Sequence, residues 1–160
     1  MGDFSEFTFS TRQFLKSYPW RQINPIPWVQ LNKDLSECRL ALISSAGFVS
    51  PNQDPFDHSI KGGDVSFREI PSSINVNQLT DYHKSKSYDH SGLRQDPNVA
   101  FPIDRVRELA ASDRIGSVNH RHFSFSGVIS APGRLIKRTA PETVNLLIHD
   151  GVDIAILIPV

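Results

Sequence analysis

The alternation of apolar and polar positions along the chain predicts an α/β fold. Near the C-terminus, Ile154 to Ile158 is an uninterrupted apolar run, which is typical of a strand buried on both faces of a parallel sheet. Such a strand requires helices on both sides of the sheet. The segment before it supplies one of them, because Val144, Leu147 and Ile148 recur at the spacing of one helical face within a predicted helix over 140–151.

Four more segments carry a pattern that indicates regular structure. Residues 39–44 form an apolar run that predicts the first core strand, and 62–71 predict a short alternating strand that Pro71 ends. The segment 75–84 is ambiguous between a strand and a helical turn, and we favour a strand. Over 101–116 an apolar stripe at helical spacing predicts a helix. Together these elements favour an open, mostly parallel sheet.

The first residues differ in composition from the rest of the chain. Residues 1–35 are rich in aromatic side chains and proline, so we interpret them as an extended N-terminal arm, and 36–160 as one α/β domain. A helix fits only before Pro19, because the prolines at positions 25 and 27 force an extended path. The aromatic side chains indicate an arm that packs onto the domain or onto a partner, and packing onto the domain is the simpler interpretation.

Composition and charge narrow the functional classes. Of the 160 residues, 39% are hydrophobic and 21% are charged, as in an ordinary globular protein. The 17 basic and 17 acidic residues balance, so no overall field attracts nucleic acid or an anionic membrane. Because neither a membrane-spanning run nor a secretory leader is recognisable, we expect a cytoplasmic protein that binds neither nucleic acid nor membrane.

The cysteine content limits redox and metal chemistry within these residues. Cys38 is the single cysteine of the sequence. It therefore cannot form an internal disulfide, a thiolate metal cluster or a two-cysteine redox pair. It also stands at the start of a strand predicted to be buried, where cysteine is usually inert.

Two short segments contain side chains suited to catalysis or metal binding. In YDHSG, Asp89 stands next to His90, and a carboxylate beside an imidazole can bind a metal ion or orient a substrate. In HRH, His120 and His122 would share one face of a strand, and a metal site would need a third ligand such as His90 or Asp89. The simpler interpretation is a turn with an exposed histidine. A metal hydrolase and a non-catalytic binding module both stay open, and we predict no resident metal.

Several longer motifs follow one another in a specific order. The chain contains ALISSAGFV, PFD, GGDVSFREIP, YDHSG followed closely by DPNVAFPIDRVREL, IGSVNHRHFSFSG and finally GVDIAILIPV. From about residue 36 to the end, this series resembles the glycine/sarcosine/betaine/D-proline reductase selenoprotein B family. The pieces GDVSFREIP and FPIDRVRELA are the most specific of the series.

The resemblance implies a Rossmann-like α/β fold and an oxidoreductase activity. Members are reductase components that cleave a C–N bond in an amino acid or its N-methylated derivative, such as glycine, betaine, sarcosine or D-proline, with electrons that come through thiols. The family's reactive group is a selenocysteine, or a cysteine in many homologues, followed after two residues by a second cysteine. It stands directly after the strand that here reads AILIPV, which ends at Val160.

This redox motif is missing from the 160 residues, so we expect an open sheet that is incomplete at the C-terminus. A selenocysteine codon read as a stop would end the chain at this point, and a frameshift would look the same. A truncated paralogue that acts as a binding module is the other explanation. No cofactor is predicted in the chain itself, and selenocysteine is expected only in a longer product.

Four residues match polar positions of the family. Asp89, His90 and Ser91 correspond to its YDHS loop, and His122 corresponds to the histidine before its aromatic-Ser-Phe segment. The resemblance therefore implies that they line a substrate pocket near the redox residue, where they orient the substrate carboxylate or supply a proton to the leaving amine.

The sequence also offers two arginines as possible ligands of a substrate carboxylate, and the resemblance implies partners. Arg68 and Arg94 are weaker candidates for binding a carboxylate, because surface arginines are common. The resemblance implies other reductase subunits and a thiol electron donor as partners, and it leaves a homo-oligomer open.

Overall fold

The chain divides into two units. Its structure is a computed structural model that describes residues 4–19, 22–85, 88 and 90–160. The units are Met1–Gln30 and Leu31–Val160. The first unit contains a short 3-10 helix, η1 (Phe4–Glu6), and the helix α1 (Phe9–Ser17).

The helix α1 begins and ends as its sequence dictates. The hydroxyl of Thr8 accepts a hydrogen bond from the backbone N–H of Thr11 at 3.4 Å, which caps the first turn. The helix ends at Ser17, two residues before Pro19, in agreement with the prediction that a helix fits only before this proline.

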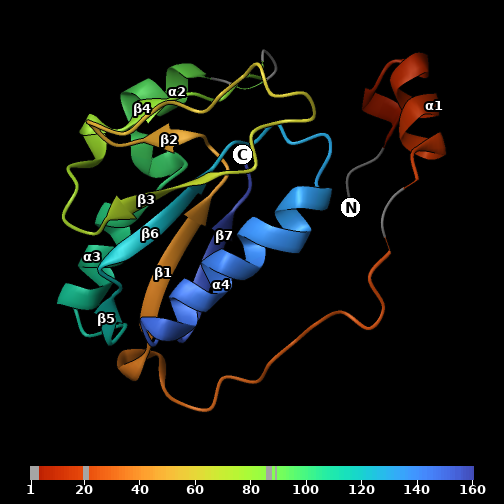
Figure 1. Cartoon of the computed structure of the whole chain (residues 1–160). Helices are drawn as coiled ribbons and strands as arrows, with labels where there is room; N and C mark the ends of the chain where they lie inside the picture. Colours follow the sequence, from red (N-terminus) through yellow and green to blue (C-terminus); the bar gives the residue numbers. More distant parts are fainter. Residues whose placement is uncertain (1–3, 20–21, 86–87, 89) are drawn as a thin grey trace. The chain divides into compact units, whose positions relative to one another are not determined.

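The second unit is an α/β structure built on an open, mostly parallel sheet (Figure 1). Its central strand is β1 (Arg39–Ser44), which pairs in parallel with β5 (Ser117–Val118) and β6 (Arg121–Phe125) on one side and with β7 (Ile154–Ile158) on the other. One strand, β3 (Phe67–Pro71), runs antiparallel to β6.

Helices and short elements surround this sheet. A separate antiparallel ladder joins β2 (Phe48–Val49) to β4 (Thr80–Asp81). The α-helices of the unit are α2 (His90–Gln95), α3 (Ile103–Ala111) and α4 (Ala140–His149), and the wide turn η5 (Leu135–Thr139) leads into α4. Three 3-10 turns are η2 (Leu35–Glu37), η3 (Val76–Gln78) and η4 (Pro97–Val99). Each helix among the described residues is too short or too polar to span a lipid bilayer.

The two faces of β1 pack into two cores because successive side chains of a strand point to opposite sides. Leu40 and Leu42 belong to the larger core, with Ile103 of α3. Ala41 packs into the smaller core with Leu147 of α4. The helix α4 thus covers the face of the sheet that is turned to the viewer in Figure 1, and α3 packs against the other face.

The strand predicted at the C-terminus is confirmed as β7 (Ile154–Ile158), but its burial on both faces is not. Among the described strands it pairs with β1 alone, so its other edge is unpaired. Leu157 is 68% exposed, and it lines a cavity on the side of the sheet that α4 covers. The prediction for α4 needs a similar correction, because the helix turns Leu147 inward and leaves Val144 and Ile148 at least half exposed.

A break between β5 and β6 changes the expected positions of two histidines. Leu40 pairs with Val118 of β5, whereas Ile43 pairs with Phe123 of β6, so two extra residues stand on that side of the ladder. The strand β6 therefore starts only at Arg121. The prediction that His120 and His122 share a strand face is wrong, because 67% of the His120 side chain is exposed whereas His122 is fully buried.

Candidate functional site

The carboxyl ends of the parallel strands meet at one edge of the sheet, where ligands bind in open α/β sheets. The backbone N–H of Ser45 donates to the carbonyl of Ile158 at 3.1 Å, which joins the ends of β1 and β7. The Ser45 hydroxyl accepts from the N–H of Val160 at 2.8 Å. Gly47 donates its N–H to the carbonyl of Phe125 in β6 at 2.9 Å. Figure 1 shows the end of the chain at this edge.

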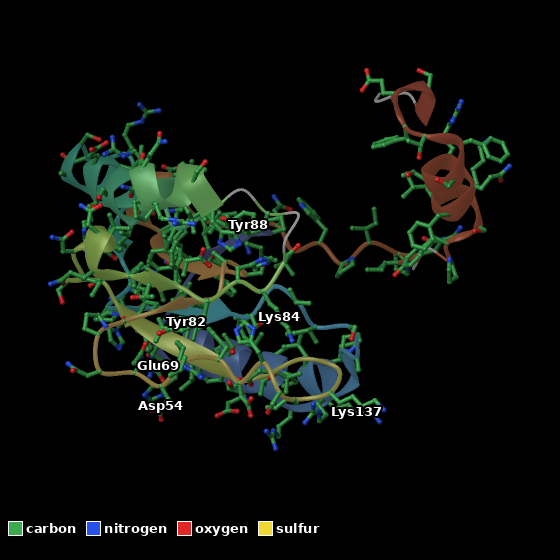
Figure 2. The ribbon with its side chains drawn as sticks, turned by 90° about the horizontal axis from the view of Figure 1, so that it is seen from above. Asp54, Glu69, Tyr82, Lys84, Tyr88 and Lys137 are labelled. Carbon is green, nitrogen blue, oxygen red and sulfur yellow. The ribbon has the colours of Figure 1, made fainter. Side chains whose placement is uncertain are left out.

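A segment between β4 and α2 crosses this edge and adds functional side chains to it. The N–H of Tyr82 donates to the carbonyl of Gly47 at 3.1 Å. The N–H of His83 donates to the carboxylate of Asp81 at 2.7 Å. Figure 2, which views the molecule from above, shows Tyr82, Lys84 and Tyr88 along this segment. The β2–β4 ladder thus holds the segment over the ends of the main strands.

The imidazole of His83 is buried at this edge and is 8% exposed. Its Nδ1 accepts a hydrogen bond from the N–H of Ser85 at 3.3 Å, and the ring also lies beside the backbone of Val160. Burial lowers the pKa of His83, although the carboxylate of Asp81 and a hydrogen bond with the backbone of Val160 oppose this shift. Burial therefore favours the neutral form of the ring.

His90 forms a tight pair with Asp81 next to His83. Its Nδ1 contacts the Asp81 carboxylate, and its Nε2 donates to the carbonyl of Ser85 at 3.2 Å. These two hydrogen bonds raise the pKa of His90, the one to Asp81 most strongly, because both favour the protonated ring. The Tyr88 ring lies between the two histidines, with centroids 4.7 Å from His83 and 5.1 Å from His90.

The structure places part of the predicted YDHS loop at this edge. His90 and Ser91 form the first turn of α2, and the Ser91 side chain is exposed. Asp89 lies outside the described residues. Arg94 follows one turn later, and its Nε donates to the carbonyl of His90 at 3.3 Å.

Two other predicted site residues lie elsewhere and bond to the backbone. His122 is fully buried in β6, where its Nδ1 accepts the N–H of Leu42 at 2.9 Å. Burial lowers the pKa of His122 to about 4. The guanidinium of Arg68 donates to the carbonyls of Asp54 and Pro55 at 2.8 and 3.0 Å and lies 4.3 Å from the centre of the Phe56 ring. It thus holds the loop beside β3, where Figure 2 shows Asp54 and Glu69.

The histidines proposed as metal ligands are not brought together. His120 lies at the amino end of β6, with Nε2 3.8 Å from the buried carboxylate of Asp150. Asp150 itself pairs with the guanidinium of Arg121 at 2.7 Å, which holds the pKa of Asp150 well below its usual range. Within the described part of the chain, no group of three His, Cys, Asp or Glu side chains is arranged to hold a metal ion.

A cavity of about 670 Å³ opens next to the carboxyl edge, on the side of the sheet that α4 covers. Its walls combine the apolar side chains of Phe125 and Leu157 with hydroxyl groups of Ser45, Ser126 and Thr143. Apolar walls with a few hydroxyl groups are typical of sites for small organic molecules.

The sequence-based interpretation missed Asp81 and His83 as members of this site. Neither lies in a motif of known chemistry, because DYH stands in the segment that is ambiguous between strand and turn. The sequence offers no local signal for them, because they reach the strand ends only through the pairing of β4 with β2.

Comparisons with known proteins give one family match and three curated relatives. Residues 8–159 match the model of the family described as glycine/sarcosine/betaine reductase selenoprotein B. The chain is 31% identical over 144 residues to the D-proline reductase subunit gamma of Acetoanaerobium sticklandii, which covers 89% of the chain and 57% of the relative. It is 26% identical over 147 residues to the sarcosine reductase complex component B subunit beta of Peptoclostridium acidaminophilum, covering 91% of the chain and 33% of the relative.

A third relative is the glycine reductase complex component B subunit gamma of Peptoclostridium acidaminophilum, with 23% identity over 148 residues. This alignment covers 91% of the chain and 33% of the relative. The chain therefore spans between one third and little more than half the length of these curated relatives. No solved structure matches it.

Proposed function

Because the chain belongs to the glycine/sarcosine/betaine reductase selenoprotein B family, we propose that it forms part of a reductase subunit for small amino acids. The reaction is a reductive cleavage of a C–N bond in glycine, sarcosine, betaine, D-proline or a similar substrate. The electrons come from a thiol, and the oxidised product is a disulfide or its selenium analogue. A Rossmann-like arrangement of the complete sheet is part of the proposal.

The observation that carries this proposal is the position of Val160. The strand β7 delivers this residue to the carboxyl edge, where its N–H is bound by Ser45 and its backbone lies beside His83. We propose that the selenocysteine or cysteine implied by the family resemblance follows directly after this position. A reactive group there would enter the cluster of His83, His90 and Asp81, next to the cavity on the α4 side of the sheet.

The predicted residues take two kinds of role in this proposal. His90, whose pKa the hydrogen bond to Asp81 raises, orients the substrate carboxylate or gives a proton to the leaving amine. Asp89 and Ser91 of the same YDHS motif are proposed to share this role. His122 and Arg68 act as positioning residues, because their hydrogen bonds hold β1 and the loop before β3.

The proposed partners follow from the names of the relatives, which are subunits of reductase complexes. We include other reductase subunits, a thiol electron donor and a second copy of the chain among them. A cytoplasmic location suits this chemistry, because a reducing compartment keeps thiols and selenols reduced.

The first experiment determines the redox residue. The gene and its transcript are sequenced past the codon for Val160, and the protein isolated from cells is analysed by mass spectrometry for selenium or additional cysteines. A product with a selenocysteine or cysteine directly after Val160 supports the proposal. A native protein without such a residue contradicts it.

The second experiment tests the role of His90 in the reductase complex that contains this subunit. The variant His90→Gln is expected to lower turnover on the order of 100-fold, the range typical of general acid–base groups. His120→Gln is the matched control, because His120 is exposed at the opposite end of the strands. Equal turnover of both variants would remove His90 from the site.

A further inference from the structure

A pocket of about 640 Å³ lies between the loop before β3 and the stretch that leads into α4. Four cations line it, which are Lys61 on the loop side and Arg134, Lys137 and Arg138 on the helix side, and no described carboxylate does. We call it the basic pocket. Because the whole chain has 17 basic and 17 acidic residues, this excess of positive charge is local.

The backbone holds the two walls of the basic pocket together. The N–H of Ala131 donates to the carbonyl of Gly62 at 3.0 Å, and the guanidinium of Arg134 donates to the carbonyl of Gly63 at 3.4 Å. Glycine permits this close approach, because a Cβ atom at Gly62 would lie 2.7 Å from the Cβ of Ala131. The fold thus brings cations from two distant segments of the chain to one pocket.

The three cations on the helix side stand where a helix tolerates them poorly. Arg134, Lys137 and Arg138 follow the i, i+3, i+4 spacing of one helical face, so their like charges repel one another. They also stand at the start of a helical stretch, since η5 continues into α4, and the positive end of a helix dipole disfavours cations. Negative charge supplied from outside would offset both effects.

No described acidic side chain forms an ion pair with these cations. In the loop, the carboxylate of Asp57 accepts the N–H and the hydroxyl of Ser59, and that of Asp64 accepts the N–H of Asp57 at 2.9 Å. Glu142, four residues after Arg138, is exposed. The positive charge of the basic pocket is therefore available to a ligand.

The basic pocket adjoins the cavity beside the carboxyl edge. Leu135 and Ala140 line the cavity of about 670 Å³, whereas Arg134 of the same stretch lines the basic pocket. The cavity also reaches Pro159, the residue after β7. A protein bound at the basic pocket would thus stand beside the position proposed for the redox residue.

The exposure of the cations favours an acidic protein surface as the ligand. All four side chains are exposed, and Figure 2 shows Lys137 on the outside of the domain. Exposed cations opposite carboxylates accelerate the association of two proteins and select the partner. A nucleic acid is less suitable, because its affinity depends on many phosphate contacts and the chain has no overall positive charge.

We propose that the basic pocket docks a carboxylate-rich surface of another protein of the reductase complex. This inference rests on the proposed function, because it names the kind of partner that meets the subunit during the reduction. The partner presents Asp and Glu side chains to the four cations. The contact is electrostatic, so it controls the association rate and weakens as salt is added.

The test compares two double variants of the subunit as isolated from cells, which lose the same number of charges. Lys137→Gln with Arg138→Gln changes the basic pocket. Arg105→Gln with Arg114→Gln is the matched control, because both arginines are exposed and lie in or just after α3, which packs on the other face of the sheet. The pocket variant should unfold at the temperature of the unmutated protein or slightly above it, since it relieves repulsion.

The first measurement is the rate at which each protein associates with the remaining subunits of the reductase complex. At about 20 mM salt the pocket variant should associate about tenfold more slowly than the unmutated protein, and the control within about twofold of it. At about 500 mM salt the difference should vanish, because screening removes the attraction. Equal rates of the two double variants at low salt would overturn the inference.

A labelled hexaglutamate peptide and a labelled DNA duplex then serve as probes of the ligand class. Hexaglutamate should bind about fivefold more weakly to the pocket variant than to the control variant. A duplex that binds more tightly than hexaglutamate, and is lost in the pocket variant, would overturn the inference in favour of a nucleic-acid site.

Trace acetylation of lysines shows whether the rest of a longer protein already covers the basic pocket. Lys61 and Lys137 should react in the isolated subunit and become protected in the complex, whereas Lys33, which pairs with Asp153 before β7, should react equally in both. Protection of Lys61 and Lys137 in the isolated subunit would overturn the inference.

The activity of the complex separates this inference from the proposed function. A complex without reductase activity would contradict the proposed function. An active complex whose subunits associate independently of the basic pocket would contradict this inference alone.

Discussion

Replacing His122 by Asn should remove a specific part of the pH dependence of stability. The imidazole is fully buried, and its Nδ1 accepts the N–H of Leu42 at a point where the β1 ladder passes from β5 to β6. The Asn side-chain oxygen can take the place of Nδ1, so His122→Asn keeps an acceptor for Leu42 but cannot be protonated near neutral pH.

The size of the effect follows from the pKa of His122. Burial lowers it from 6.5 to about 4 in the folded protein, so below pH 6.5 the unfolded chain binds a proton that the folded protein excludes. Stability is therefore lost as the pH falls from 6.5 towards 4. The total loss is about 3 kcal/mol, and about 2 kcal/mol of it is reached at pH 5.

The assay is urea unfolding of the unmutated protein and of His122→Asn at pH 7 and at pH 5. The Asn side chain is smaller than the imidazole and fills the core less well. This packing loss lowers the free energy of unfolding of the variant equally at both pH values. The difference between the two proteins should therefore shrink by about 2 kcal/mol at pH 5, because only the unmutated protein contains the titrating ring. His120→Asn, at an exposed histidine, should show no such change.

A difference between unmutated protein and His122→Asn that stays constant from pH 7 to pH 5 would refute the reasoning. It would mean that the ring accepts a proton in the folded protein, which requires an exposed His122 and a different role for it. This outcome would favour the original prediction of a substrate pocket at His122.

Two further predictions concern the rigid parts of the fold. Arg121→Gln should lower the free energy of unfolding by about 3 kcal/mol, because it leaves the carboxylate of Asp150, 2% exposed, without its cation. Arg105→Gln, which breaks an exposed pair, should cost less than about 1 kcal/mol in the same urea assay, and equal losses would contradict the argument. Gly63→Ala should destabilise by about 2 kcal/mol in thermal unfolding, because φ is +99° and the new Cβ would lie 2.5 Å from a carbonyl oxygen. Gly133→Ala, where the new Cβ meets open space, should leave the midpoint temperature of unfolding nearly unchanged. An equal fall of the midpoint temperature in both variants would show that the clash at Gly63 is not the cause.

Elements with a long local apolar pattern could be predicted from the sequence. The strand β1 (Arg39–Ser44) and the helix α3 (Ile103–Ala111) lie where the pattern places them, as does β7 (Ile154–Ile158). The ambiguous segment 75–84 contains both alternatives, because the 3-10 turn η3 precedes the two-residue strand β4. Whether a segment forms a helix or a strand depends largely on residues that are close together in the sequence. A local pattern of apolar residues is therefore enough to predict such an element.

Burial could be predicted less well, because it depends on neighbours that are distant in the sequence. An apolar run such as Ile154 to Ile158 suits a strand buried on both faces, but only a second neighbouring strand would cover its outer edge. In α4 the periodicity identifies apolar positions but not which of them faces the sheet. Thr143 and Leu147 point inward, whereas Ile148 is 68% exposed.

The candidate site illustrates why a residue's chemistry does not reveal its role. His83 and His122 are both buried imidazoles whose Nδ1 accepts a backbone N–H. His122 lies near the start of β6, beside the break in the ladder, where its Nδ1 accepts the N–H of Leu42. His83 lies beyond the strand ends, where its ring packs against Gly127 and forms a hydrogen bond with the backbone of Val160. Strand register and loop paths give these two histidines different surroundings, and both arise from pairings between residues far apart in the chain.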